Sequence, residues 1–244
     1  MIRLCSALTL LFLAPAATAE GLLQLSFKGA IHAEGGSPVS IEVGVWDAAS
    51  RAATTIPMDL HLAEGTTAHD LAVVVGARLK RRGAHVVLPL EGSVGRGVVH
   101  LFVEDATHVS LRLGGGLWGT VTSCEAAPEQ VRFLAPQVTK DSAEIHIGVS
   151  IFHPHTKQRG REDLAFEAES ALGAARLSEL LTAMSIRQGF RADRPSPEGW
   201  HAARMADGSV VTGCSVQVLS PDADWGVEMI LGTPFVAGDP SVPR

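Results

Sequence analysis

Histidines near the middle of the chain are the residues whose types and spacing come closest to a chemical site. His153 and His155 lie two residues apart, and side chains at that spacing in extended backbone point to the same side. Neutral imidazole is a common ligand of zinc, copper and nickel. A third ligand is needed, and His146 is the nearest candidate. The sequence thus indicates a divalent transition-metal site formed by His153, His155 and His146.

An alternative interpretation of this segment needs no metal. The two histidines flank Pro154 and are followed by the polar and basic residues 156–161. Such a composition is typical of a solvated turn. We favour this interpretation, a basic hairpin tip, because only two of the three imidazoles are close in sequence.

No sequence motif of a known catalytic machinery is present. The segment 91–95 lacks the spacing of the Gly-x-Ser-x-Gly nucleophile elbow. The chain also has no His-Glu-x-x-His zinc motif, no phosphate-binding loop and no dinucleotide fingerprint. Three consecutive glycines at 114–116 predict a turn or bulge. We therefore expect no catalytic residue, and a hydrolase with an unrecognised site is only a third hypothesis.

The N-terminus has the pattern of an export signal. Arg3 precedes an apolar stretch at 8–13, and Ala17-Thr18-Ala19 provides the small residues of a cleavage site. The apolar stretch is well short of the roughly 20 residues that span a bilayer. We expect residues 1–19 to be a signal peptide, and the mature protein, starting at Glu20, to be periplasmic or secreted.

Composition restricts the partners of the exported chain. The formal net charge of the full chain is −6, and an acidic protein is not expected to bind nucleic acid. No later segment suggests a membrane span, and residues 237–244 form a polar tail. A partner, if there is one, is expected to be another envelope or surface protein.

Two cysteines remain after the predicted cleavage, Cys124 and Cys214. An even number in an oxidising compartment favours a disulfide, and both lie in strand-like sequence. The alternative is a pair of separately buried thiols. We expect a bridge with a stabilising role, because neither cysteine belongs to a Cys-x-x-Cys redox pair.

A repeat organises the rest of the chain. Residues 40–45 match 144–149, and 59–64 match 163–168, both at a spacing of 104. A helix is expected to follow in each half. The first spans 67–82, with Thr67 as N-cap, Asp70 in a capping box and Gly83 as the stop.

The second helix spans about 172–188 and stops at Gly189. Strands are expected after each helix, at 98–103 and 107–113 in the first half and at 200–205 and 209–219 in the second, and each half ends on a short strand, at 131–134 and 227–231. The order β-β-α-β-β-β thus occurs twice, in units 20–138 and 139–236. The predicted fold class is α+β, a mostly antiparallel sheet with one helix packed on each unit.

The segment 63–75, which reads Ala-Glu-Gly-Thr-Thr-Ala-His-Asp-Leu-Ala-Val-Val-Val, resembles a module of bacterial surface proteins and phage-tail-like proteins. In that module a strand leads into a helix that starts at a Gly-Thr-Ala sequence, and a hairpin follows. The second half is similar more loosely, since Ser170-Ala171-Leu172-Gly173 replaces the helix start. The resemblance implies structural or interaction work and brings no catalytic residues.

Three hypotheses follow for function. The first is an exported non-enzymatic structural or interaction protein of the bacterial envelope or extracellular space. The second is a secreted ligand- or metal-binding protein with its site near His153 and His155. The third is the unrecognised hydrolase. A fold alone does not decide between them.

Overall fold

Fourteen strands and two helices make up the part of the chain that the computed structural model describes. The described residues are 21–47, 49–50, 52–87, 97–124, 128, 130–134, 143–153, 155–168, 174–187, 190–192, 199–205, 209–218 and 225–231. The predicted signal peptide, the boundary at 138/139 and the polar tail lie outside these residues. No helix within the described ranges is long and apolar enough to cross a membrane.

The elements follow in this order: β1 (Leu23–Gly29), β2 (Ser37–Asp47), β3 (Ala52–Leu62), α1 (Ala68–Arg81), β4 (Val86–Val87), β5 (Val98–Val103), β6 (Ala106–Leu113), β7 (Leu117–Ser123), β8 (Gln130–Leu134), β9 (Ala143–His153), β10 (Gln158–Ala168), α2 (Ala174–Arg187), β11 (Phe190–Ala192), β12 (Gly199–Met205), β13 (Val210–Val218) and β14 (Trp225–Ile230). The expectation of a mostly antiparallel sheet with two helices is confirmed. The expected strand at 59–64 belongs to the longer β3, and β1, β4, β7 and β11 were not predicted.

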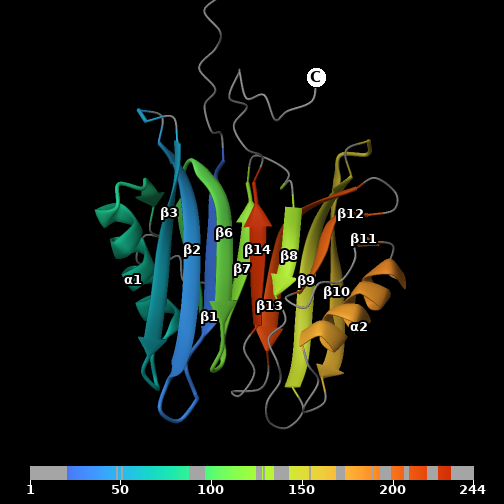
Figure 1. Ribbon diagram of the computed structural model, residues 1–244, viewed down its shortest axis with the longest axis horizontal. Coiled ribbons are helices and arrows are strands. Elements are labelled where there is room, and N and C mark those ends of the chain that lie inside the picture. The colour runs from blue at the N-terminus through green and yellow to red at the C-terminus, as the bar shows by residue number, and fades with distance from the viewer. Residues whose placement is uncertain are drawn as a thin grey trace, which may run out of the picture.

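The strands form two layers that face each other (Figure 1). The front sheet has the order β3-β2-β6-β14-β8-β12-β11. The back sheet has the order β4-β5-β1-β7-β13-β9-β10. One antiparallel pair, Arg204 with Val210, joins β12 to β13 and links the two sheets.

Alternation along the strands builds the core between the layers. In β2 the side chains of Val39, Ile41 and Val43 are at most 2% exposed, while the residues between them face outward. The inner face of β7 lies against β6, since a Cβ at Gly119 would contact Leu111. Each sheet therefore has one apolar inner face and one outer face with mainly polar side chains.

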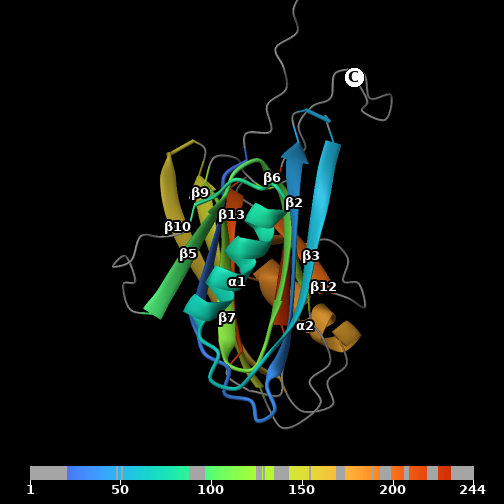
Figure 2. The same cartoon turned by 90° about the vertical axis from the view of Figure 1, so that its left-hand side faces the viewer.

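The two helices lie at opposite ends of this sandwich (Figure 1). Helix α1 packs on β1, β4 and β5 of the back sheet and touches β3 of the front sheet, as Figure 2 shows from the side. Helix α2 packs on β11 and β12. The helices close the ends at which the hydrophobic core would otherwise be exposed.

Helix α1 begins and ends where the sequence predicts. Thr67 is the N-cap, and its side chain accepts from the Asp70 backbone N–H while Asp70 accepts from the Thr67 backbone N–H. Leu71, Val75 and Leu79 are buried. Gly83, with φ of 87°, follows the helix in the left-handed region that glycine tolerates best.

Removing this cap is expected to destabilise the protein moderately. Thr67→Ala should lower the free energy of unfolding by about 0.5–2 kcal/mol, whereas Thr66→Ala, one residue outside the cap, should have little effect. Hydrogen bonds from the Thr67 side chain and backbone lower the pKa of Asp70. Its contribution is therefore present above the unfolded-state pKa and lost as pH falls through the lower folded-state pKa.

Urea unfolding of wild type and Asp70→Asn measures this pH dependence. The difference in stability should be largest at neutral pH and shrink in strong acid. A difference that is the same at both pH values would contradict the assigned role of the ionised Asp70 carboxylate.

Candidate functional site

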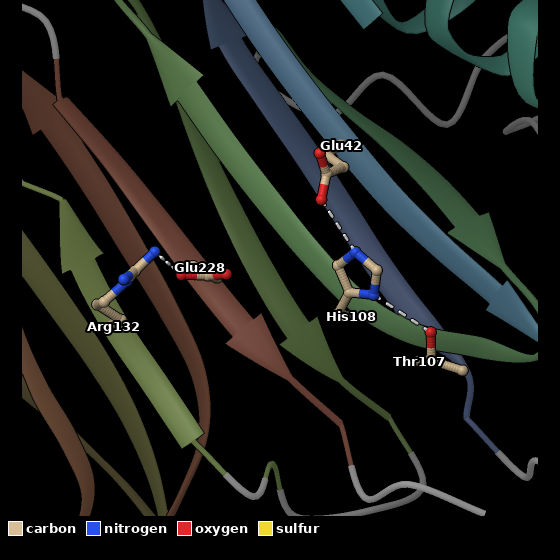
Figure 3. Close-up of polar contacts among 5 residues, drawn as sticks. All are labelled: Glu42, Thr107, His108, Arg132 and Glu228. Carbon is tan, nitrogen blue, oxygen red and sulfur yellow. Dashed lines mark hydrogen bonds and ion pairs between the residues drawn. The ribbon is translucent and has the colours of Figure 1, made fainter. Parts of the chain in front are cut away.

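Charged side chains cross the outer face of the front sheet in a row (Figure 3). Strand register places Glu42 of β2 opposite Ser110 of β6, Ser110 opposite Glu228 of β14, and Glu228 opposite Arg132 of β8. We call these four residues the charged row. Ionisable groups concentrated on one face make it the clearest candidate site among the described residues.

His108 is attached to one end of the charged row. Its Nε2 lies 3.2 Å from a carboxylate oxygen of Glu42, and its Nδ1 lies 3.3 Å from the Thr107 hydroxyl. The ring lies against Gly44, where any Cβ would overlap it. The close approach of His108 to the sheet therefore requires glycine at position 44.

Arg132 and Glu228 form an ion pair in the middle of the front sheet. Their side chains are only 29% and 24% exposed, so water screens the pair less than it would screen a fully exposed one. Both carboxylates of the charged row thus lie beside a nitrogen base or cation. The ionisable groups of this face are thus paired with one another, Glu42 with His108 and Glu228 with Arg132.

A hydroxyl–imidazole pair lies on the outer face of the back sheet, and the sequence did not predict it. The Ser26 hydroxyl is 2.7 Å from Nδ1 of His100, and the Gln24 amide nitrogen lies 3.0 Å from both atoms. Ser26 is only 5% exposed. The three side chains satisfy one another and connect β1 to β5, so the Ser26 oxygen is poorly placed to attack a substrate.

The histidines of the predicted metal site are spread over the β9–β10 hairpin. His153 ends β9 and contacts the Ser209 hydroxyl, His155 is exposed in the following turn, and His146 lies seven residues earlier on β9, beside Glu144. At about 3.3 Å per residue, His146 and His153 are roughly 23 Å apart. The structure therefore does not bring the three imidazoles to one ion. Within the described ranges, no three His, Cys, Asp or Glu residues are grouped to hold a metal.

The predicted disulfide is not formed in the structure. Cys124 is exposed and Cys214 is buried, and the two are not bonded to each other. Cys214 lies opposite Val121 in the β13–β7 register and faces the core, whereas Cys124 follows the end of β7. The two side chains thus lie three residues out of register, which exceeds the reach of a disulfide.

Thiol labelling distinguishes the two arrangements. Burial raises the pKa of the Cys214 thiol, and the thiolate is the reactive form. In the chain starting at Glu20 without reductant, maleimide should therefore label Cys124 in the native protein and both cysteines after denaturation. A Cys124→Ser variant should show no native labelling. If the denatured, unreduced protein shows no labelling at either cysteine, the disulfide interpretation would be restored.

Comparisons with known proteins identify no relative. No protein-family model matches the chain, and neither curated proteins nor solved structures give a significant match.

Proposed function

We propose that the chain is an exported non-enzymatic protein that acts by contact, as a structural or interaction component of the bacterial envelope or the extracellular space. The predicted signal peptide supports export. Two broad sheets with polar outer faces support a role in contact, because long paired strands present a rigid surface.

One observation carries the non-enzymatic part of the proposal. The pair closest to a nucleophile and its base, Ser26 with His100, is closed by Gln24, and Ser26 is 5% exposed. An activated serine needs a base that is oriented by a third group and a hydroxyl open to substrate.

A serine-directed probe tests this proposal against the hydrolase hypothesis. A fluorophosphonate is incubated with the mature protein, with Ser26→Ala and with Ser150→Ala, which removes a hydroxyl from β9 of the same sheet. We expect no labelling above the denatured control in any of them. Labelling of wild type that Ser26→Ala alone abolishes would overturn the proposal and identify an enzyme.

We further propose that the chain consists of two copies of one unit. The run β2, β3 and α1 has lengths of 11, 11 and 14 residues, as does the run β9, β10 and α2. Corresponding elements start 106 residues apart. The same spacing relates Phe27 of β1 to Phe133 of β8, both fully buried. The sequence match at 104 is thus two residues out of register, which leaves each side chain on its correct face.

A β-bulge supports the equivalence of the units. Gly44 pairs with His108 and Val45 with Ala106, so Thr107 is the extra residue of β6. Ser150 and Ile151, 106 residues later, pair with Gly213 and Val211, so Thr212 is the extra residue of β13. Bulges are specific structural features rather than random irregularities, and both copies have one at the same place with the same residue type.

The strand pairings suggest how the two units interlock. Strand β7 pairs with β1 and with β13, and in the same way β14 pairs with β8 and with β6. We therefore assign β1–β7 with α1 to the first unit and β8–β14 with α2 to the second. This places the boundary between β7 and β8 instead of after 138. The last strand of each unit therefore pairs with a strand of the other unit, β7 with β13 and β14 with β6.

A further inference from the structure

The β9–β10 hairpin holds an unusual concentration of positive charge for this chain. From 152 to 161 there are three cations, Lys157, Arg159 and Arg161, two histidines and no acidic residue, in a chain of net charge −6. All three cations are exposed. We propose that this basic hairpin (152–161) binds a linear polyanion, an acidic polysaccharide outside the cytoplasm. The inference rests on the proposed export of the chain.

The cations are arranged along a line. Arg159 and Arg161 lie on one face of β10, separated by two residues, or about 6.6 Å, and Lys157 precedes them in the turn with φ of 60°. Within the described residues β10 pairs only with β9, so the line follows the edge of the back sheet. A chain-like ligand with regularly spaced charges can follow such an edge.

One of the three cations is held in position. The Arg161 guanidinium lies against Gly148, where a Cβ would overlap it. Its Nε donates to Asp163 at 2.8 Å and its Nη2 donates to the Ser215 hydroxyl at 3.1 Å. The Arg161 side chain is still 56% exposed. A guanidinium that is already ordered loses less conformational entropy when it binds a carboxylate or sulfate.

The corresponding hairpin in the first unit lacks this charge. Strands β2 and β3 have the same lengths as β9 and β10 and are joined by a connection of the same length, but residues 46–55 contain only one acid, Asp47, and one base, Arg51. The hairpin fold therefore does not require the cations. Their presence in one copy only points to a role in binding.

A linear polymer fits the surroundings better than a charged bilayer. The β2–β3 hairpin, which contains Asp47, extends from the same end of the sandwich as the basic hairpin (Figure 1). A flat anionic surface would meet both hairpins, but only the basic hairpin carries a net positive charge. A polymer needs to contact only the segment from Lys157 to Arg161, which precedes the acidic Glu162 and Asp163 of β10.

Binding of the mature protein to labelled dextran sulfate and polygalacturonate, with neutral dextran as a control, tests the proposal. The two acidic polymers distinguish sulfate from carboxylate as the preferred group. K157Q/R159Q removes two exposed cations from the basic hairpin. The matched variant K80Q/R82Q also removes two exposed cations, Lys80 in the last turn of α1 and Arg82 just after the helix.

We expect wild type to bind at least one acidic polymer and not neutral dextran. K157Q/R159Q should weaken binding on the order of tenfold at low salt. The slope of log affinity against log salt concentration should become less negative by about 1.4, or about 0.7 for each cation removed. The affinity of K80Q/R82Q should stay within about twofold of that of wild type, because this variant changes only the net charge and not the basic hairpin. Both variants should retain the wild-type circular dichroism spectrum.

Three results would overturn the proposal: no binding to either acidic polymer, equal losses in the two variants, or binding only to vesicles that contain anionic phospholipid. None of these results bears on export. Export is tested independently, by determining the N-terminal residue and the location of the mature protein. Failure of the polymer proposal is therefore distinguishable from failure of the proposed function.

Discussion

Phe27→Ala and Phe133→Ala are each expected to lower the free energy of unfolding by about 3–5 kcal/mol in a single transition of the whole chain. Both side chains are fully buried, so truncation removes a large apolar area and leaves a cavity. Because β7 and β14 each pair with strands of both proposed units, neither unit should unfold while the other stays intact.

Urea unfolding followed by tryptophan fluorescence and by far-ultraviolet circular dichroism measures both points. Phe102→Ala is the matched control, since Phe102 lies on β5 and is only partly buried, and its loss should cost clearly less. Two separated transitions, with Phe27→Ala shifting only one of them, would contradict an interlocked pair of units.

Local signals made the helices predictable from sequence. The capping box of Thr67 and Asp70 and the stop at Gly83 all act within a few residues of the helix they delimit. Alternation likewise identified β5 and β6 almost to the residue. β7 was missed because it follows three glycines and contains Gly119, which interrupts the apolar alternation.

Side-chain partners far apart in the sequence could not be predicted. Ser26 and His100 are separated by 74 positions, and Glu42 and His108 by 66. Alternation shows which face a residue occupies, but strand order decides which neighbour it meets. The cysteines show the same limit, since their strand-like surroundings gave no information on register.

The structure does not bring His146, His153 and His155 to one ion, for a reason that is visible in the sequence. Residues 143–153 form one uninterrupted strand, so His146 could not fold back toward His153. The basic residues after His155 held the more informative signal. They stand out beside the β2–β3 hairpin, whose tip has the same length and no net charge.

Cysteine cross-linking between β7 and β13, and between β6 and β14, tests the strand pairing between the two proposed units most directly. Thr120 lies opposite Ser215, and Ser110 opposite Glu228; directly opposed residues have Cα atoms about 4.5–5.5 Å apart, within disulfide range. In a Cys124→Ser background, T120C/S215C and S110C/E228C are each predicted to form a disulfide nearly completely. The first should also raise the free energy of unfolding by up to about 4 kcal/mol.

The control T122C/S215C places the thiols two residues out of register and should remain reduced. Mass spectrometry of the oxidised, unreduced proteins reads all three results. The strand register predicts an intramolecular disulfide in both in-register variants and none in the control. Cross-linking of only one in-register pair, or of the control in preference to them, would contradict the interlocked two-unit fold.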